Sequence, residues 1–200
     1  MRERPILMSG PMVKAILEGR KTQTRRAATP QPVPIAGLYF RHCGHALWAG
    51  YMPPGEPADI HEIRCPYGQP GDRLWVRETW APCGPQSYPA ADMVRHGDDG
   101  AIHRAAWDRS PPARWRPSIF MPRWASRLTL EVTGVRVERV QEISVADCRA
   151  EGVRIPTDDS LLPYEYRALW DKLNAKRGYG WDKNPWVWVV ELKPTDAGGP

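Results

Sequence analysis

The chain has 200 residues, a formal net charge of +5, 22 proline residues and 10 tryptophan residues. Its mean hydropathy is −0.56, no apolar run approaches the ~20 residues of a membrane span, and this length can bury a core without disulfides. These properties exclude membrane proteins, disulfide knots and coiled coils, and the tryptophan content argues against general disorder. The many arginine and tryptophan residues remain to be explained.

The first part of the chain predicts a strand, a helix and an extended basic segment. An apolar strand is expected over 5–8, and the helix that follows is capped by Ser9 or Gly10 and ends at Gly19. Residues 20–26 alternate β-branched with longer polar side chains, a pattern typical of extended backbone. The basic segment therefore leads directly from a helix stop into a strand.

Two proline-rich stretches interrupt the regular pattern. Residues 28–70 predict a long loop or insertion with a brief strand at 37–41, and a second irregular insertion is expected over about 81–118. Between them, 72–78 follow a Pro-Gly turn and predict a strand. We expect one domain over 1–200 that carries both insertions.

The last part of the chain predicts two strands and two helices. Residues 127–140 alternate between apolar and polar side chains, with a bulge or turn at Gly134. A capping box opens a helix over 144–152, a second helix is expected over 163–176, and a strand over 185–193 follows. Strands joined by long loops, with three short helices, predict an α+β, mainly β fold: a small barrel with helices at its ends.

The cysteines bear on metal binding and on the compartment. No signal peptide is evident, so reduced thiols and a cytoplasmic location are expected. Cys43, His45, His61 and Cys65 offer the thiolate and imidazole ligands of a tetrahedral zinc site. Because their spacing is tighter than in usual zinc loops, the alternative, which we favour, is that they are ordinary loop residues and that no cofactor is bound.

The basic segment over 19–26 is the first candidate for chemistry. Lys21 can act as a base if desolvation lowers its pKa, and Thr24 needs such a base to become a nucleophile. The segment is not a phosphate-binding P-loop, because the second glycine of that motif is missing. The alternative is a basic edge strand with solvated side chains.

Arginine and tryptophan interleave between 104 and 127, which is the second candidate. This pattern suits phosphate contact combined with base stacking, as in grooves for single-stranded nucleic acids. The alternative is that arginines stack on tryptophans and seal a surface loop. The candidate nucleic-acid-binding residues are Arg114, Arg116, Arg123, Trp124 and Arg127.

Two glutamates are candidate acids or bases. Glu78 ends the strand predicted over 72–78, and Glu151 lies at the C-terminal end of the helix predicted over 144–152. A carboxylate at that end of a helix opposes the helix dipole, which makes Glu151 a candidate proton shuttle. The alternative is that both are surface charges or pair with nearby arginines.

The motifs together resemble the ASCH family, whose domain is a PUA-like β-barrel. The helix followed by Gly-x-Lys-Thr-x-Thr-x-Arg, the Gly-Asp-x-Leu strand, the helix ending in Ala-Glu-Gly and the closing strand all match its pattern. The longer phage and prophage branch also carries the Cys-Pro-Tyr-Gly-x-Pro-Gly-Asp and Met-Pro-Arg-Trp-Ala-Ser-Arg stretches. In this sequence the matching segments are 19–26, 71–78, 147–152, 186–192, 65–72 and 121–127.

The resemblance implies an amidohydrolase that removes the acetyl group of N(4)-acetylcytidine or acts on a related modified pyrimidine nucleoside or nucleotide. The family's catalytic lysine, threonine and glutamate fall on Lys21, Thr24 and Glu151. We expect the substrate cleft to be lined further by Arg25, Arg26, Glu78 and Trp80. The alternative partners are single-stranded RNA or DNA, bound by a non-enzymatic module or cut by a ribonuclease.

Strand geometry sets one condition on this site. Residues 21 and 24 would point to opposite faces of a regular strand. Lys21 must therefore lie before the strand begins, or a bulge must separate it from Thr24. Trp80 has its own alternative, because it could be a core tryptophan and not a stacking platform for a nucleobase.

Overall fold

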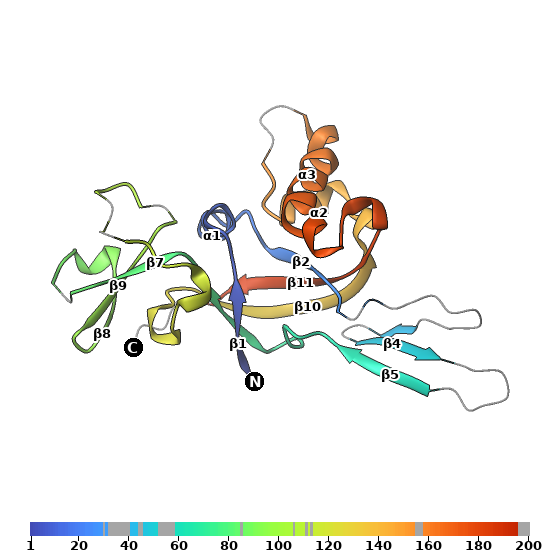
Figure 1. Ribbon diagram of the computed structural model, residues 1–200, viewed down its shortest axis with the longest axis horizontal. Helices are drawn as coiled ribbons and strands as arrows, with labels where there is room; N and C mark the ends of the chain where they lie inside the picture. Colours follow the sequence, from blue (N-terminus) through green and yellow to red (C-terminus); the bar gives the residue numbers. More distant parts are fainter. Residues whose placement is uncertain are drawn as a thin grey trace. The chain divides into compact units, whose positions relative to one another are not determined.

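The structure is a computed structural model (Figure 1). Within it the fold is α+β, with mixed and antiparallel sheets and a few short helices. No helix among the described residues is long and apolar enough to cross a membrane. Side chains of 41–43, 46–51, 59–63 and 159 are not described. The structure describes residues 1–29, 31, 41–43, 46–51, 59–84, 86–105, 107–110, 112, 114–154 and 158–195.

The chain forms two compact units. The first comprises 1–20, 71–131 and the segment from 193 on, and the second comprises 21–70 and 132–192. The single domain predicted over the whole chain stays a prediction.

The first unit begins with a strand and a helix, as expected. Strand β1 (Glu3–Leu7) pairs in parallel with β6 (Arg73–Arg77), and the start of β10 (Thr129–Arg139) pairs antiparallel with β6. Helix α1 (Gly10–Leu17) starts after Ser9, carries a proline in its first turn and buries its apolar face. Gly19, with φ of 71°, follows the helix in the left-handed conformation that favours glycine.

The second proline-rich stretch contains an antiparallel sheet where irregular structure was predicted. Its strands are β7 (Trp80–Cys83), β8 (Val94–His96) and β9 (Asp99–His103), in the order β7-β9-β8. A two-residue turn joins β8 and β9, and Gly97 in it has φ of 57°. The short helical turns of this unit are η1 (Ala90–Asp92), η2 (Ser118–Phe120) and η3 (Arg123–Ala125).

In the second unit, β2 (Gln23–Ala27) pairs antiparallel with β11 (Trp186–Pro194). The hydrogen-bonded order of the large sheet is β1-β6-β10-β11-β2, so β1 and β2 are its end strands. The described strands therefore do not close into a barrel. Strand β2 lies at a sheet edge, as the alternative for the basic segment predicted.

Two helices pack beside β2 and β11 in the second unit (Figure 1). Helix α2 (Val145–Ala150) starts at Ser144, whose side chain forms the predicted capping box with Asp147, and α3 (Leu162–Asn174) follows. The core between them and the sheet consists of Val140, Ile143, Cys148, Leu162, Tyr166, Trp170, Val187 and Val189. The short turns here are η4 (Val140–Glu142), η5 (Asp159–Leu161), η6 (Ala175–Arg177) and η7 (Trp181–Lys183).

The first proline-rich stretch also forms strands, which corrects the prediction of a long loop. Strands β3 (Arg41–Cys43), β4 (Ala46–Tyr51) and β5 (Asp59–Arg64) make an antiparallel sheet in that order. No proline falls within these strands, so the prolines mark the ends of elements without preventing pairing. Of the brief strand predicted at 37–41, residues 37–40 lie outside the described residues.

Strand β10 changes its buried face at Gly134. Leu130 and Val132 are buried before this glycine, and Val135 and Val137 are buried after it. The alternation therefore shifts by one residue, as a bulge there would cause. A Cβ atom at Gly134 would lie 2.5 Å from the Oε2 atom of Glu191, so glycine leaves room for that carboxylate.

Candidate functional site

Lys21 lies just before β2 and is buried with its ammonium group fully bonded. Its Nζ atom donates to the Oε2 atom of Glu151 at 2.9 Å, to the backbone carbonyl of Glu151 at 2.9 Å and to that of Gln23 at 2.7 Å. The backbone is held here because Thr22 donates to the carbonyl of Ala150 and accepts from the amide of Leu192. The position of Lys21 before the strand meets the geometric condition set by the sequence.

Burial and charge act in opposite directions on Lys21. Burial lowers the pKa of its amine, and the Glu151 carboxylate opposes that shift. Three acceptors match the three N–H groups of an ammonium, so the geometry is that of the charged form. The buried side chain excludes a solvated basic segment at this position.

Glu151 is the C-cap residue of α2 and is also buried. Two cations face it: Lys21 at its Oε2 atom, and the Nη1 atom of Arg25 at 3.6 Å from its Oε1 atom. The Oε1 atom has no hydrogen-bond partner among the described residues. The alternative that Glu151 is a surface charge is therefore wrong, and the alternative that it pairs with a nearby arginine is met by Arg25, although its shorter contact is to Lys21.

Thr24 is buried within β2, opposite Val190 of β11. Its hydroxyl has no hydrogen-bond partner in the part of the chain that the structure describes, so no hydrogen bond joins it to Lys21. Because side chains alternate along a strand, Thr24 lies on the opposite face of β2 from Gln23 and Arg25.

The Lys21 ammonium lies at the free edge of β2. The carbonyl of Thr22 accepts a hydrogen bond from Leu192 of β11. Successive carbonyls of a strand point to opposite sides, so the carbonyl of Gln23, which Lys21 caps, points away from β11. The ammonium therefore occupies the edge between the two faces of β2, one of which carries Thr24.

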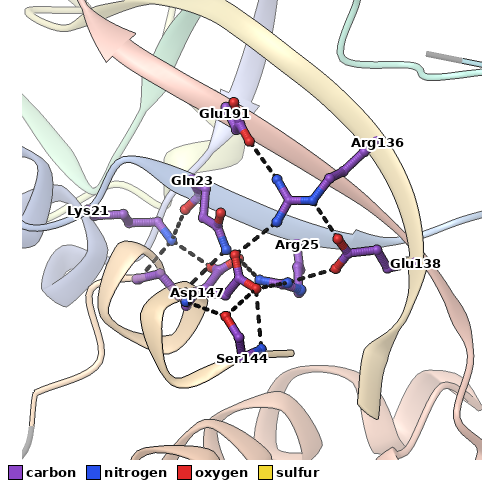
Figure 2. Close-up of polar contacts among 9 residues, drawn as sticks. Lys21, Gln23, Arg25, Arg136, Glu138, Ser144, Asp147 and Glu191 are labelled. Atoms are coloured by element: carbon purple, nitrogen blue, oxygen red, sulfur yellow. Dashed lines mark hydrogen bonds and ion pairs between the residues drawn. The ribbon is translucent and has the colours of Figure 1, made fainter. Parts of the chain in front are cut away.

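Arg25 connects β2 to β10 and α2 (Figure 2). Its Nη2 atom lies 2.8 Å from the Oε2 atom of Glu138 and 3.2 Å from the Oδ2 atom of Asp147. Although burial raises the pKa of Asp147, hydrogen bonds from Ser144 and the charge of Arg25 outweigh it and lower that pKa to about 2. Arg26, the next residue of β2, is half-buried.

Arg136 extends this network along β10. Figure 2 shows its guanidinium reaching Glu138, Asp147 and Glu191. The contacts to Asp147 and Glu191 are 2.8 Å and 2.6 Å long. Arg136 and Glu138 were not among the site residues predicted from the sequence. The alternation of side chains along β10 was a signal that could have found them, because it places Arg136 and Glu138 together on the face of the strand opposite the buried Val135 and Val137.

Glu78 belongs to the first unit and is almost fully buried there. Arg127 forms two parallel hydrogen bonds to its carboxylate, at 2.9 Å and 3.1 Å. Burial raises the pKa of Glu78, against the effect of Arg127. Glu78 therefore pairs with an arginine, which was one of the alternatives predicted for it, and it is not a surface charge.

Trp80 and the arginines around it also pack within the first unit. Trp80 is buried in a cluster with Ala101, Met121 and Ala125, and the ring of Trp124 meets its own at 6.0 Å, edge to face. The guanidinium of Arg116 lies 5.4 Å from the Trp80 ring. These contacts are those of a core tryptophan sealed by an arginine.

Two further arginines were predicted to contact nucleic acid, and one of them has protein partners while the other is exposed. Arg123 pairs with Glu3 at 3.0 Å and lies 5.9 Å from the ring of Trp75. Arg114 is exposed. Because Glu78 and Trp80 lie in the first unit and Lys21 in the second, the cleft predicted to contain them stays a prediction.

The zinc prediction falls mainly on undescribed atoms. His45 and the side chains of Cys43 and His61 lie outside the described residues, whereas Cys65 is described and buried. Among the side chains that the structure describes, no group of three or more histidine, cysteine or acidic residues could hold a metal ion.

His103 of β9 is a buried titratable residue that was not among the site residues predicted from the sequence. Its Nε2 atom lies 2.7 Å from the carbonyl oxygen of Ala125. Burial, and then the charge of Arg127, lower the pKa of His103 to about 4, so this side chain is neutral at pH 7. No spaced partner in the sequence marked it.

Comparisons of the chain with protein-family models, with curated proteins and with solved structures found no match.

Proposed function

We propose that the protein is an amidohydrolase that acts on an N-acylated pyrimidine nucleoside or nucleotide such as N(4)-acetylcytidine, and that its fold is the PUA-like fold of the ASCH family. One observation carries the proposal. The desolvated Lys21 ammonium lies 2.9 Å from the Glu151 carboxylate, at the edge of the strand that holds the unpartnered Thr24 hydroxyl. A base, an acid and a nucleophile are the groups that amide hydrolysis needs.

The Lys21–Glu151 pair can supply both proton-transfer groups. Transfer of one proton from Nζ of Lys21 to Oε2 of Glu151 gives a neutral amine and a neutral carboxylic acid. The amine then takes the proton of Thr24, whose oxygen attacks the acyl carbonyl. Glu151 donates its proton to the exocyclic nitrogen as the carbon–nitrogen bond breaks, which leaves an acyl-threonine and restores the charged pair.

Water completes the reaction by the reverse proton transfers. The Glu151 carboxylate takes a proton from water as the hydroxide adds to the acyl carbon. The Thr24 oxygen leaves with a proton from Lys21, and the carboxylic acid product is released. Transfer of the proton from Glu151 to Lys21 then restores the resting pair.

The proposal requires movement at the edge of β2. The Nζ atom of Lys21 must exchange its bond to the Gln23 carbonyl for one to Thr24, whose hydroxyl is buried. Hydrogen bonds of catalytic groups often form only in the substrate complex. We therefore propose that substrate binding opens this edge and aligns the two side chains.

The alternative function is binding, or cleavage, of single-stranded RNA or DNA. Two of the arginines predicted to contact phosphate already donate to protein carboxylates, since Arg123 pairs with Glu3 and Arg127 pairs with Glu78. Engaged guanidiniums have fewer donors left for phosphate. This observation counts against phosphate binding by these two arginines.

The test is an assay of N(4)-acylated cytidines with the wild type, Lys21→Met and Thr24→Ala. Thr22→Ala is the matched control, because Thr22 is an exposed threonine two residues from Thr24. We expect Lys21→Met and Thr24→Ala to lose turnover while folded, and Thr22→Ala to keep it. Unchanged rates in the first two variants would refute the assignment, and steeply salt-dependent binding of an oligonucleotide without turnover would favour the alternative.

A further inference from the structure

Arg25 is enclosed by three carboxylates, and it is the only described residue that pairs with Glu151 besides Lys21. Its side chain is 0% exposed. Glu138 and Asp147 hold one terminal nitrogen, Nη2, at 2.8 Å and 3.2 Å, while Nη1 faces Oε1 of Glu151 at 3.6 Å. The guanidinium is therefore fixed at one end and faces Glu151 with the other.

The charges form an alternating series that leads from the protein surface to Lys21. Glu191 is 48% exposed and pairs with Arg136, which pairs with Glu138 and Asp147. These two carboxylates hold the fully buried Arg25, which faces Glu151, the partner of Lys21. Each buried charge thus has neighbours of opposite sign, as burial of a charge requires.

We propose that Arg25 is a positioning residue that holds the Glu151 carboxylate with its Oε2 atom against Lys21. Lys21 faces one oxygen of Glu151 and Arg25 faces the other, so neither cation pairs with both oxygens of the carboxylate. Glu138 and Asp147 keep Arg25 from moving toward Glu151 and displacing Lys21. Lysine cannot replace arginine here, because a single ammonium cannot span the Glu138–Asp147 side and the Glu151 side together.

Chemical labelling tests this positioning without any substrate. Acetic anhydride acylates exposed amines, and the Lys21 product is quantified by peptide mass spectrometry against that of Lys14, whose side chain is 62% exposed. In Arg25→Gln and Arg25→Lys we expect Lys21 labelling to rise at least about tenfold, the change that ~1.4 kcal/mol of lost local stabilisation gives. Arg167→Gln is the matched control, since Arg167 pairs with Asp182 in the same unit, outside the carboxylates that hold Arg25, and it should label like the wild type.

The kinetic effect rests on the proposed function, whereas the labelling effect does not. If the protein is an amidohydrolase, Arg25→Lys should lower kcat by up to about 100-fold with KM little changed, because a displacement of the order of 1 Å has that effect. Absence of turnover in the wild type would refute the hydrolase and leave the labelling test valid.

Two results would overturn the positioning role. Wild-type labelling of Lys21 in folded Arg25→Lys would show that Glu151 does not depend on the guanidinium. Failure of both Arg25 variants to fold, while Arg167→Gln folds, would show that Arg25 serves the fold as a whole and not Glu151. Circular dichroism and thermal unfolding of each variant distinguish these cases.

Discussion

Replacing Glu151 with glutamine measures the energetic role of the buried ion pair. The variant keeps the shape of the side chain but leaves the Lys21 ammonium, 0% exposed, without a carboxylate. Removing one partner of a buried pair costs about 3–5 kcal/mol. Two backbone carbonyls still accept from Lys21, so we expect a loss of unfolding free energy at the lower end, about 3 kcal/mol.

The assay is urea unfolding at pH 7, followed by tryptophan fluorescence, for Glu151→Gln, Lys21→Met and the double variant. If the two side chains stabilise each other, the double variant loses less than the sum of the single losses, by about 2 kcal/mol. Glu165→Gln, a change at an exposed glutamate on α3, is the control and should stay within about 0.5 kcal/mol of the wild type. Strictly additive losses would refute the reasoning.

Three further predictions concern the contributions of His103, Asp147 and Gly134 to stability. The pKa of His103 is about 4 in the folded protein, below its unfolded value of about 6.5. The folded state therefore gains up to about 3 kcal/mol from the neutral side chain above pH 6.5 and loses it as pH falls to about 4. His103→Gln should flatten this part of the curve of unfolding free energy against pH. Asp147, with a folded pKa of about 2, contributes stability above pH 4 that is lost as pH falls toward 2. After allowance for solvent screening this contribution is about 1 kcal/mol, and Asp147→Asn should remove it in urea titrations at pH 2–5. Gly134→Ala forces the Glu191 carboxylate away from Arg136 and should cost about 1 kcal/mol in thermal unfolding.

Each of these predictions has an outcome that contradicts it. For His103→Gln, a slope between pH 4 and pH 6.5 equal to the wild type would assign the effect to other groups. An unchanged acid midpoint in Asp147→Asn would show that the contacts from Ser144 and Arg25 do not hold its proton affinity down. For Gly134→Ala, the Glu191→Ala background is the control, and an equal cost there would exclude the close approach of the carboxylate.

The regular elements could be predicted from the sequence because each carries a local signal. Ser144 and Asp147 marked the start of α2, and the alternation of β10 and the apolar run of β11 marked two strands of the large sheet. The sheets within 28–70 and 81–118 were missed, because prolines and glycines suggested loops while the pairing partners there depend on turns such as that at Gly97.

The site was predicted in part, and the limit is physical. Local spacing marked Lys21 and Glu151 as chemical groups, but the distance of 2.9 Å between them results from the packing of α2 against β2. The ion pair of Arg25 with Glu138 joins residues 113 positions apart, and that of Arg136 with Glu191 joins residues 55 positions apart, which no local pattern indicates. The pairs of Arg127 with Glu78 and of Arg123 with Glu3 arise in the same way.

The central claim is that Thr24 attacks the acyl group of an N-acylated cytidine. The most direct measurement is peptide mass spectrometry of the protein quenched with acid a short time after mixing with N(4)-acetylcytidine. The mechanism predicts one acetyl group on Thr24 in the wild type and none in Thr24→Ala. Release of cytidine with no acetylated protein at any time, or acetylation confined to exposed lysines, would contradict it.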